Sequence, residues 1–346
     1  MPHDPTELDR AVTALRAGEL VAFPTETVYG LGADAANPLA VAKIFAAKGR
    51  PADHPLIVHL PGAGYLEQWA SEVPPMAWEL AEAFWPGPLT LILKRARRVP
   101  KAVSGGQDSI GLRLPAHPLA LDLLRAYAAA GGGRDGLSGI AAPSANRFGR
   151  ISPTEATHVR EELGDAVQVV LDGGRCPLGI ESTILDLTVA AGQPPRLLRP
   201  GHLSPETIAQ VIGVEPTWPE STHANRPRVS GSLAAHYAPQ TPLRMVSSER
   251  LEHTLLTLLA KGQRCGVLCR QPCPVSADAV RRVLPDEPTG YAFALYAVLR
   301  ELDQRDLDLI LVEEIPPTAA WRAVADRLGR AVHGSGGGST AKCEQH

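Results

Sequence analysis

Hydrophobic residues along the first 200 positions have the spacing of helices in some stretches and form the short runs of strands in others. Leu8, Val12 and Leu15 lie three or four residues apart, which predicts a first helix. Amphipathic stretches predict three more helices, over residues 38–49, 74–87 and 118–130. Short apolar runs bounded by turn residues predict strands over residues 19–24, 56–60, 89–94, 110–115, 140–146, 167–174, 182–188 and 195–201. Helices and strands alternate at first and strands then crowd together, so we expect an α/β or α+β domain around a twisted mixed sheet.

The pattern changes after residue 212. Residues 213–241 show no periodicity and are rich in Pro, Ser and Thr, which is typical of a linker or of a lid over a site. An α/β pattern then resumes, with predicted strands at 243–246, 264–269 and 308–315 and helices at 249–259, 291–302 and 319–328. We therefore predict a first domain over 1–212, a linker or lid over 213–241, a small α/β domain over 242–330 and a flexible tail over 331–346.

Charge and composition narrow the class of protein. A formal net charge of −3 gives no overall positive field to hold nucleic acid, and aromatic residues that could stack on bases make up 5% of the chain. No apolar run approaches the ~20 residues of a membrane span, and the first ten residues do not resemble a leader. The five cysteines are odd in number, which argues against a secreted disulfide scaffold. We expect a cytoplasmic protein without membrane contact.

Polar side chains cluster directly after the first predicted strand. The sequence FPTETVYGLG supplies Thr25, Glu26, Thr27 and Tyr29. Hydroxyl groups at such positions can satisfy the backbone of a turn. They also stand at the carboxyl end of a strand, where open α/β sheets bind ligands. Four polar side chains in five positions favour a binding role.

Two cations follow one another at the end of the second predicted helix. Lys48 fits a helix C-terminus, where the helix dipole favours a positive charge. Arg50 lies beyond Gly49 and next to Pro51, where the chain is stiff, and a fixed guanidinium can bind two phosphate oxygens. The pair therefore predicts an anion site.

Three later motifs add hydroxyl, amide and guanidinium groups. The first, APSANRFGRISPT, could cap a following helix or bind the phosphates or sugar of a ligand, and its candidates are Ser144, Asn146 and Ser152. The other two, GIESTILDLT and RLLRPG, supply Ser182, Arg196 and Arg199. For the arginines, a salt-bridged strand edge is the simpler alternative.

Neither usual glycine-rich phosphate loop occurs in the sequence. Cys265, Cys269 and Cys273 are spaced by four, but a zinc site would want a closer pair, and the neighbouring prolines break any helix that could align them. We expect no metal bound by protein side chains alone.

Six motifs in this order resemble the YrdC-type L-threonylcarbamoyladenylate synthases: FPTETVYGLG, KGRP followed by HPLIVH, SIGLRLP, APSAN, GIESTI and LLRPG. HYAPQTPL followed by a small α/β pattern is similar to the longer, two-domain form of that family. The resemblance implies a YrdC-like twisted mixed sheet with flanking helices and a smaller C-terminal Rossmann-like domain.

The resemblance also implies an activity. Enzymes of this family are nucleotidyltransferases that make threonylcarbamoyl-AMP and pyrophosphate from L-threonine, bicarbonate or CO₂, and ATP, with Mg²⁺ expected on the ATP phosphates. The product is the first intermediate of the N6-threonylcarbamoyladenosine (t6A) modification at position 37 of tRNA. Partner proteins perform the transfer to tRNA, so strong tRNA binding is not expected.

Carried over motif by motif, the resemblance implies a set of site residues. Those expected around threonine are Thr27, His59, Arg113, Ala142 (through its backbone) and Ser182. Those expected around ATP are Lys48, Arg50, His54, Ser109, Ser144, Asn146, Ser152, Arg196 and Tyr237. Lys48 and Arg50 are expected to be catalytic, because all reactants are anionic and cations bring them together. At the position of His54 the family more often has Asn or Ser.

Residues 230–239 are expected to become ordered as a lid when ligands bind. Two other functions stay open at this point: an RNA-binding module that recognises tRNA, and a carbamoyl-transfer enzyme of hydrogenase maturation. The second would carry zinc-finger-like cysteine pairs and an acylphosphatase segment, which the sequence does not show.

Overall fold

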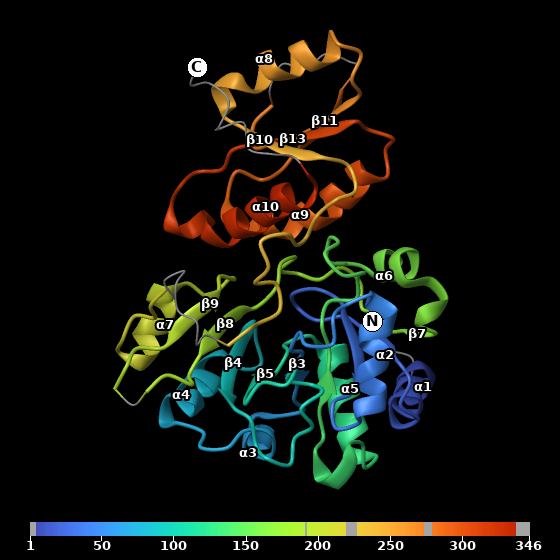
Figure 1. Ribbon diagram of the computed structural model, residues 1–346, viewed down its shortest axis with the longest axis vertical. Coiled ribbons are helices and arrows are strands. Elements are labelled where there is room, and N and C mark those ends of the chain that lie inside the picture. Colours follow the sequence, from blue (N-terminus) through green and yellow to red (C-terminus); the bar gives the residue numbers. More distant parts are fainter. Residues whose placement is uncertain (1–4, 191, 219–226, 273–278, 337–346) are drawn as a thin grey trace. The chain divides into compact units, whose positions relative to one another are not determined.

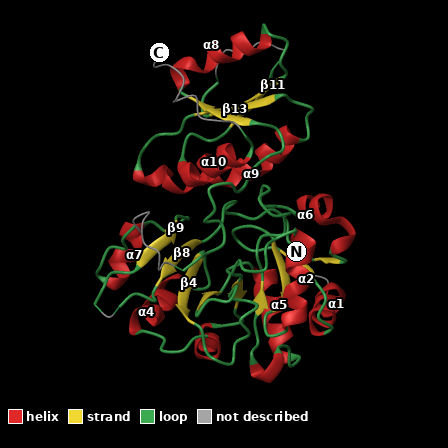
Figure 2. Cartoon of the chain, in the orientation of Figure 1, coloured by secondary structure: helices red, strands yellow, loops and turns green. Residues whose placement is uncertain are grey.

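The computed structural model describes residues 5–190, 192–218, 227–272 and 279–336 (Figures 1 and 2). The chain divides into two compact units. The first holds the chain up to Phe148 together with Pro153–Ser232, and the second holds Gly149–Ser152 together with the chain from Leu233 on. None of the helices in the described ranges has the length and apolar character that a bilayer crossing requires.

A mixed sheet forms the middle of the first unit, and helices cover both of its faces (Figure 2). Its strands are β1 (Val21–Phe23), β2 (Gly30–Asp34), β3 (Ile57–His59), β4 (Leu89–Lys94), β5 (Ser109–Arg113), β6 (Ile140–Ala141), β7 (Val169–Val170), β8 (Thr183–Asp186) and β9 (Arg196–Arg199). They follow the order β7-β1-β2-β6-β3-β5-β4-β8-β9. Strand pairs β1–β7, β3–β5 and β4–β8 are parallel and the others are antiparallel, which confirms the predicted mixed sheet.

The helices of this unit are α1 (Pro5–Arg16), α2 (Pro38–Lys48), α3 (Leu66–Trp69), α4 (Pro75–Phe84), α5 (Pro118–Ala129), α6 (Ala156–Leu163) and α7 (Pro205–Ile212). Successive side chains of a strand point to opposite faces of a sheet. In β1, Val21 and Phe23 pack in a core with Leu15 of α1 and Leu123 of α5, whereas Ala22 joins the larger core on the other face. The sheet is therefore buried on both sides.

Local sequence explains how α2 ends with two cations. The Asn37 side chain accepts a hydrogen bond from a first-turn N–H, and Pro38 takes the first helical position. Gly49 adopts a φ of 61°, in the left-handed region that glycine enters without steric cost, and the helix stops there. The chain thus turns between Lys48 and Arg50.

The second unit is built on a smaller sheet in which all strands are parallel. Its strands are β10 (Leu243–Val246), β11 (Cys265–Cys269), β12 (Val280–Val283) and β13 (Leu309–Glu313), in the order β10-β13-β11-β12. Its helices are α8 (Ser248–Leu259), α9 (Pro288–Asp303) and α10 (Arg322–Gly334). Leu251 and Leu255 of α8 pack on Val267 and Leu311 of the sheet. The predicted small α/β fold is confirmed.

Several elements differ from the sequence-based expectation. The hydrophobic pattern does not predict strands β2 and β12 or helices α6 and α7. Helix α10 continues to Gly334, so regular structure extends into the region expected to be a flexible tail. Cys273 and the last ten residues of the chain lie outside the described residues.

Candidate active site

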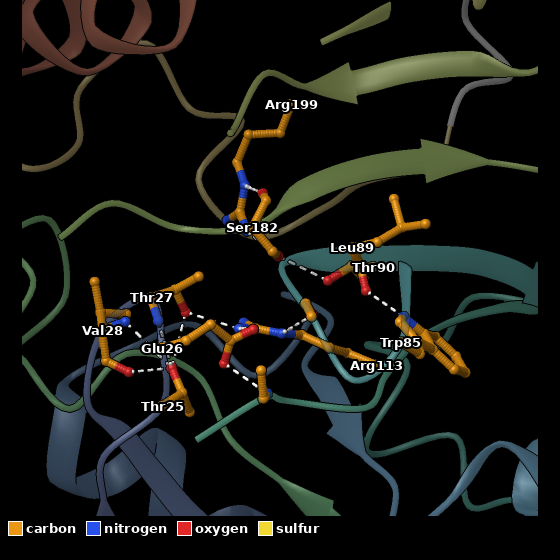
Figure 3. Close-up of polar contacts among 12 residues, drawn as sticks. Thr25, Glu26, Thr27, Val28, Trp85, Leu89, Thr90, Arg113, Ser182 and Arg199 are labelled. Atoms are coloured by element: carbon orange, nitrogen blue, oxygen red, sulfur yellow. Dashed lines mark hydrogen bonds and ion pairs between the residues drawn. The ribbon is translucent and has the colours of Figure 1, made fainter. Parts of the chain in front are cut away.

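One end of the large sheet brings together polar side chains from four adjacent strands. The register pairs His59 of β3 with Arg113 of β5. The registers of β5 with β4 and of β4 with β8 bring Thr90 and Ser182 to the same end of the sheet. Figure 3 shows Arg113, Thr90 and Ser182 with their polar contacts.

Arg113 is the buried cation of this group, with 4% of its surface exposed. Its Nη2 lies 2.7 Å from Oε1 of Glu26, which is also buried, and donates to Oγ1 of Thr27 at 3.0 Å (Figure 3). The second carboxylate oxygen of Glu26 accepts from the backbone N–H of Ala116 at 3.0 Å. A buried charge needs such a partner, so Glu26 fixes Arg113 and balances its charge.

His59 stands beside Arg113 at the end of β3 and is buried. Burial, and then the charge of Arg113, lower the pKa of its imidazole to about 3. The ring is therefore neutral near pH 7 and adds no second positive charge beside the guanidinium. Its plane meets the ring of Phe23 edge-on, with the ring centres 6.1 Å apart.

Ser182 precedes β8 and is completely buried. Its Oγ lies 2.8 Å from Oγ1 of Thr90 and accepts from Nη2 of Arg199 at 3.0 Å (Figure 3). The Nε of Arg199 donates to the Ser182 carbonyl, also at 3.0 Å. A third donor of Arg199, Nη1, binds the carbonyl of Ser230 at 3.0 Å. Arg199 therefore joins Ser182 to the part of the predicted linker that belongs to the first unit.

Lys48 is buried against the loop that follows β6. Its ammonium donates to the backbone carbonyls of Ser144 and Asn146. Burial, and then the neighbouring Arg50, hold the pKa of Lys48 well below its usual value. An ammonium has three N–H donors, and these two carbonyls accept from two of them. The third donor would make the expected contact with a phosphate. The N–H of Ala142, in the same loop, donates to the Ile57 carbonyl at 3.0 Å.

Arg50 reaches two neutral oxygen atoms. Its Nη2 donates to the Pro55 carbonyl at 3.0 Å and to Oγ of Ser230 at 3.2 Å. A pocket adjoins these partners, and its lining includes Pro55, Ser109 and residues 228–230. A residue expected to bind ATP, Ser109, thus shares a pocket with the first-unit part of the predicted linker.

Two further candidates of the first unit, His54 and Arg196, contact other residues. His54 meets the ring of Phe148 edge-on at 5.3 Å, and burial, followed by Arg50, lowers its pKa. Arg196 forms an ion pair with the fully buried Asp186 at 2.9 Å, as the strand-edge alternative predicted.

Two residues expected around ATP, Ser152 and Tyr237, belong to the second unit. Tyr237 is buried and has a φ of 61°, which is uncommon for a residue with a side chain. Within that unit its ring stacks on Tyr296, with centres 5.7 Å apart, and lies 5.2 Å from the guanidinium carbon of Arg327.

The set of site residues implied by the resemblance does not include Glu26, Thr90, Arg199 or Ser230. Thr90 carried a signal, because it is the one hydroxyl in the otherwise apolar run LTLIL. Glu26 was noted in its polar cluster, but nothing in the sequence indicates that its partner is Arg113, 87 positions away.

Comparisons with known proteins fit both units. A family model named for Sua5, YciO and YrdC and described as telomere recombination matches residues 13–201. A second model, described as the C-terminal domain of threonylcarbamoyl-AMP synthase, matches residues 203–332. The chain belongs to the Sua5/YciO/YrdC family. Because both models match, it is a two-domain enzyme of the Sua5 type, as the six motifs together with HYAPQTPL and the following α/β pattern predicted.

Similar members of the family span nearly the same length. The threonylcarbamoyl-AMP synthase of Pyrococcus abyssi is 40% identical over 325 residues, which cover 92% of this chain and 91% of that protein. That of Bacillus subtilis is 40% identical over 339 residues, with coverages of 96% and 94%. The crystal structure of P. abyssi Sua5 complexed with L-threonine is 38% identical, with a TM-score of 0.87 over 97% of this chain and 96% of that one.

Proposed function

We propose that this enzyme makes threonylcarbamoyl-AMP and pyrophosphate from L-threonine, bicarbonate or CO₂, and ATP. The observation that carries the proposal is the group of His59, Arg113 and Ser182 at one end of the sheet, in a chain 40% identical to threonylcarbamoyl-AMP synthases. The product would serve the t6A modification of tRNA in the cytoplasm, and separate transfer proteins would deliver it to the tRNA.

The proposed threonine site consists of Thr27, His59, Arg113, Ala142 and Ser182. Arg113 would bind the carboxylate of the amino acid, since a guanidinium held in place by Glu26 loses little freedom when it accepts a ligand. A neutral His59 leaves Arg113 as the dominant positive charge at this position. The hydroxyl groups of Thr27 and Ser182 would orient the rest of the molecule.

The proposed ATP site consists of Lys48, Arg50, His54, Ser109, Ser144, Asn146, Ser152, Arg196 and Tyr237. Arg50 would bind the phosphates, because one guanidinium can hold two phosphate oxygens at once. Among the described residues, no three His, Cys, Asp or Glu side chains are grouped to hold a metal ion. Mg²⁺ would be bound to the phosphates of ATP, which offer the oxygen ligands that this cation prefers.

The chemistry needs positioning and charge more than a protein nucleophile. The threonine amine takes up CO₂ to form a carbamate, and a carbamate oxygen attacks the α-phosphorus of ATP while the bond to pyrophosphate breaks. Carbamate and triphosphate repel each other. Lys48 and Arg50 would reduce that repulsion and hold the reacting atoms in line. A buried site also protects the carbamate from water.

Pyrophosphate release tests the proposal directly. The enzyme is incubated with Mg²⁺, ATP and bicarbonate, with and without L-threonine, and pyrophosphate is measured. We expect release that depends on threonine, with threonylcarbamoyl-AMP detected by mass spectrometry in proportion. Equal release without threonine would contradict the proposed reaction.

A further inference from the structure

The contacts of Ser182 limit how its hydroxyl group can bind a ligand in the proposed threonine site. A hydroxyl has one hydrogen to donate and two lone pairs to accept with, whereas a guanidinium only donates and a carbonyl only accepts. The partners of the Ser182 hydroxyl therefore decide whether it can donate to a ligand.

Two groups contact the Ser182 hydroxyl. Arg199 donates to its Oγ, so one lone pair is occupied. Within the described residues, Ser182 is the one hydrogen-bond partner of the Thr90 hydroxyl, and both residues are fully buried. A buried hydroxyl hydrogen without an acceptor is costly. Both hydroxyl hydrogens have an acceptor only if Thr90 donates to Ser182 and Ser182 donates to a bound ligand.

We infer that Thr90 and Arg199 are positioning residues that make Ser182 a hydrogen-bond donor to the bound amino acid. Ser182 would then bind a carboxylate or hydroxyl oxygen, and L-threonine offers both. The inference rests on the proposed threonine site, because it assumes that the Ser182 hydroxyl group faces the substrate.

Substitutions at Thr90 test the inference, since valine keeps the shape and removes the hydroxyl whereas serine keeps the hydroxyl. We expect Thr90→Val to raise the KM for threonine by about three- to tenfold, the effect of one hydrogen bond. The KM for ATP and kcat should stay within about twofold, and Thr90→Ser should restore the threonine KM. A general packing defect would change the ATP parameters as well. If Thr90→Val does not fold, Thr90→Cys, with a weaker donor, should give an intermediate threonine KM.

A double-mutant cycle with Ser182→Ala separates this inference from the site on which it rests. Ser182→Ala should raise the threonine KM, and Thr90→Val should add nothing in that background, because its effect passes through Ser182. If Ser182→Ala raises the KM but Thr90→Val does not, or if the two effects add fully, the positioning role is wrong and the threonine site stands. If Ser182→Ala leaves the threonine KM unchanged, the assignment of Ser182 to the site is itself wrong.

Discussion

At the scale of single residues, the proposed site depends on partners that keep buried polar groups satisfied. Arg113 has Glu26, and Ser182 has Thr90 and Arg199. Removing one member of such a group leaves the other buried without its partner, which costs more than the lost contact. Stability measurements can therefore distinguish a buried ion pair from an exposed ion pair with the same N–O distance.

Glu26→Gln tests the buried ion pair. The amide keeps the size of the side chain but leaves Arg113 without a countercharge, so we expect the free energy of unfolding to fall by about 3–5 kcal/mol. The matched control is Glu19→Gln, because Glu19 lies 2.7 Å from Lys43 in an exposed pair and should cost less than about 1 kcal/mol. Both are measured by urea unfolding. Equal losses in the two variants would mean that the Glu26 pair contributes no more than a surface contact.

His59 should make the fold sensitive to mild acid. Its pKa is about 3 in the folded chain and near 6.5 when unfolded, so between these values the unfolded state binds a proton that the folded state does not. Stability is therefore lost as the pH falls below about 6.5, by roughly 1 kcal/mol per pH unit from this group. Unfolding measured from pH 7 to 5 should show a shallower slope in His59→Asn. Parallel slopes would mean that His59 is not held neutral by burial.

At the scale of elements, the sequence predicted those helices and strands whose own residues show a periodic hydrophobic pattern. Strand β4 has the bounds predicted from the run LTLILK, and helix α2 ends where Gly49 indicates. Strand β2 was not predicted because its sequence, GLGAD, has no β-branched residue. It forms a strand because β1 and β6 pair with its two edges, which are contacts that a local pattern does not contain.

Gly49→Ala tests the end of α2. A Cβ at this position meets no atom within 4 Å, so strain from the φ of 61° is the main expected effect, about 1 kcal/mol of lost stability. Gly64→Ala is the control, because that position is equally open but has no positive φ. It should leave the free energy of unfolding within about 0.5 kcal/mol of the parent. A neutral Gly49→Ala variant would show that the turn before Arg50 tolerates a side chain.

At the scale of the whole molecule, the predicted linker is divided between the two units. Residues 227–232 belong to the first unit, where Arg228 pairs with Asp53 at 3.0 Å and Ser230 contacts Arg50. Residues from 233 on, including Tyr237, belong to the second. The hypothesis of a ligand-dependent lid over residues 230–239 stays a prediction, and it concerns the stretch where the chain passes from one unit to the other.

Limited proteolysis checks that hypothesis. Chymotrypsin cuts after leucine and tyrosine, and Leu233 is 40% exposed. Cleavage after Leu233, followed by mass spectrometry, should slow when ATP and threonine are added together. An unrelated peptide substrate added to both samples serves as the control for the activity of the protease. An unchanged rate at Leu233 would argue against closure.

The sequence by itself determined the α/β class, most helix and strand positions and, through six motifs in order, the family. Those properties depend on local periodicity and on residue types at fixed spacing. Tertiary structure decided the partners, since Glu26 meets Arg113, and Thr90 and Arg199 meet Ser182, only after strands from distant parts of the chain align in one sheet. The donor role proposed for Ser182 depends on those partners, because a hydrogen bond depends on position in space and a sequence pattern records only position along the chain.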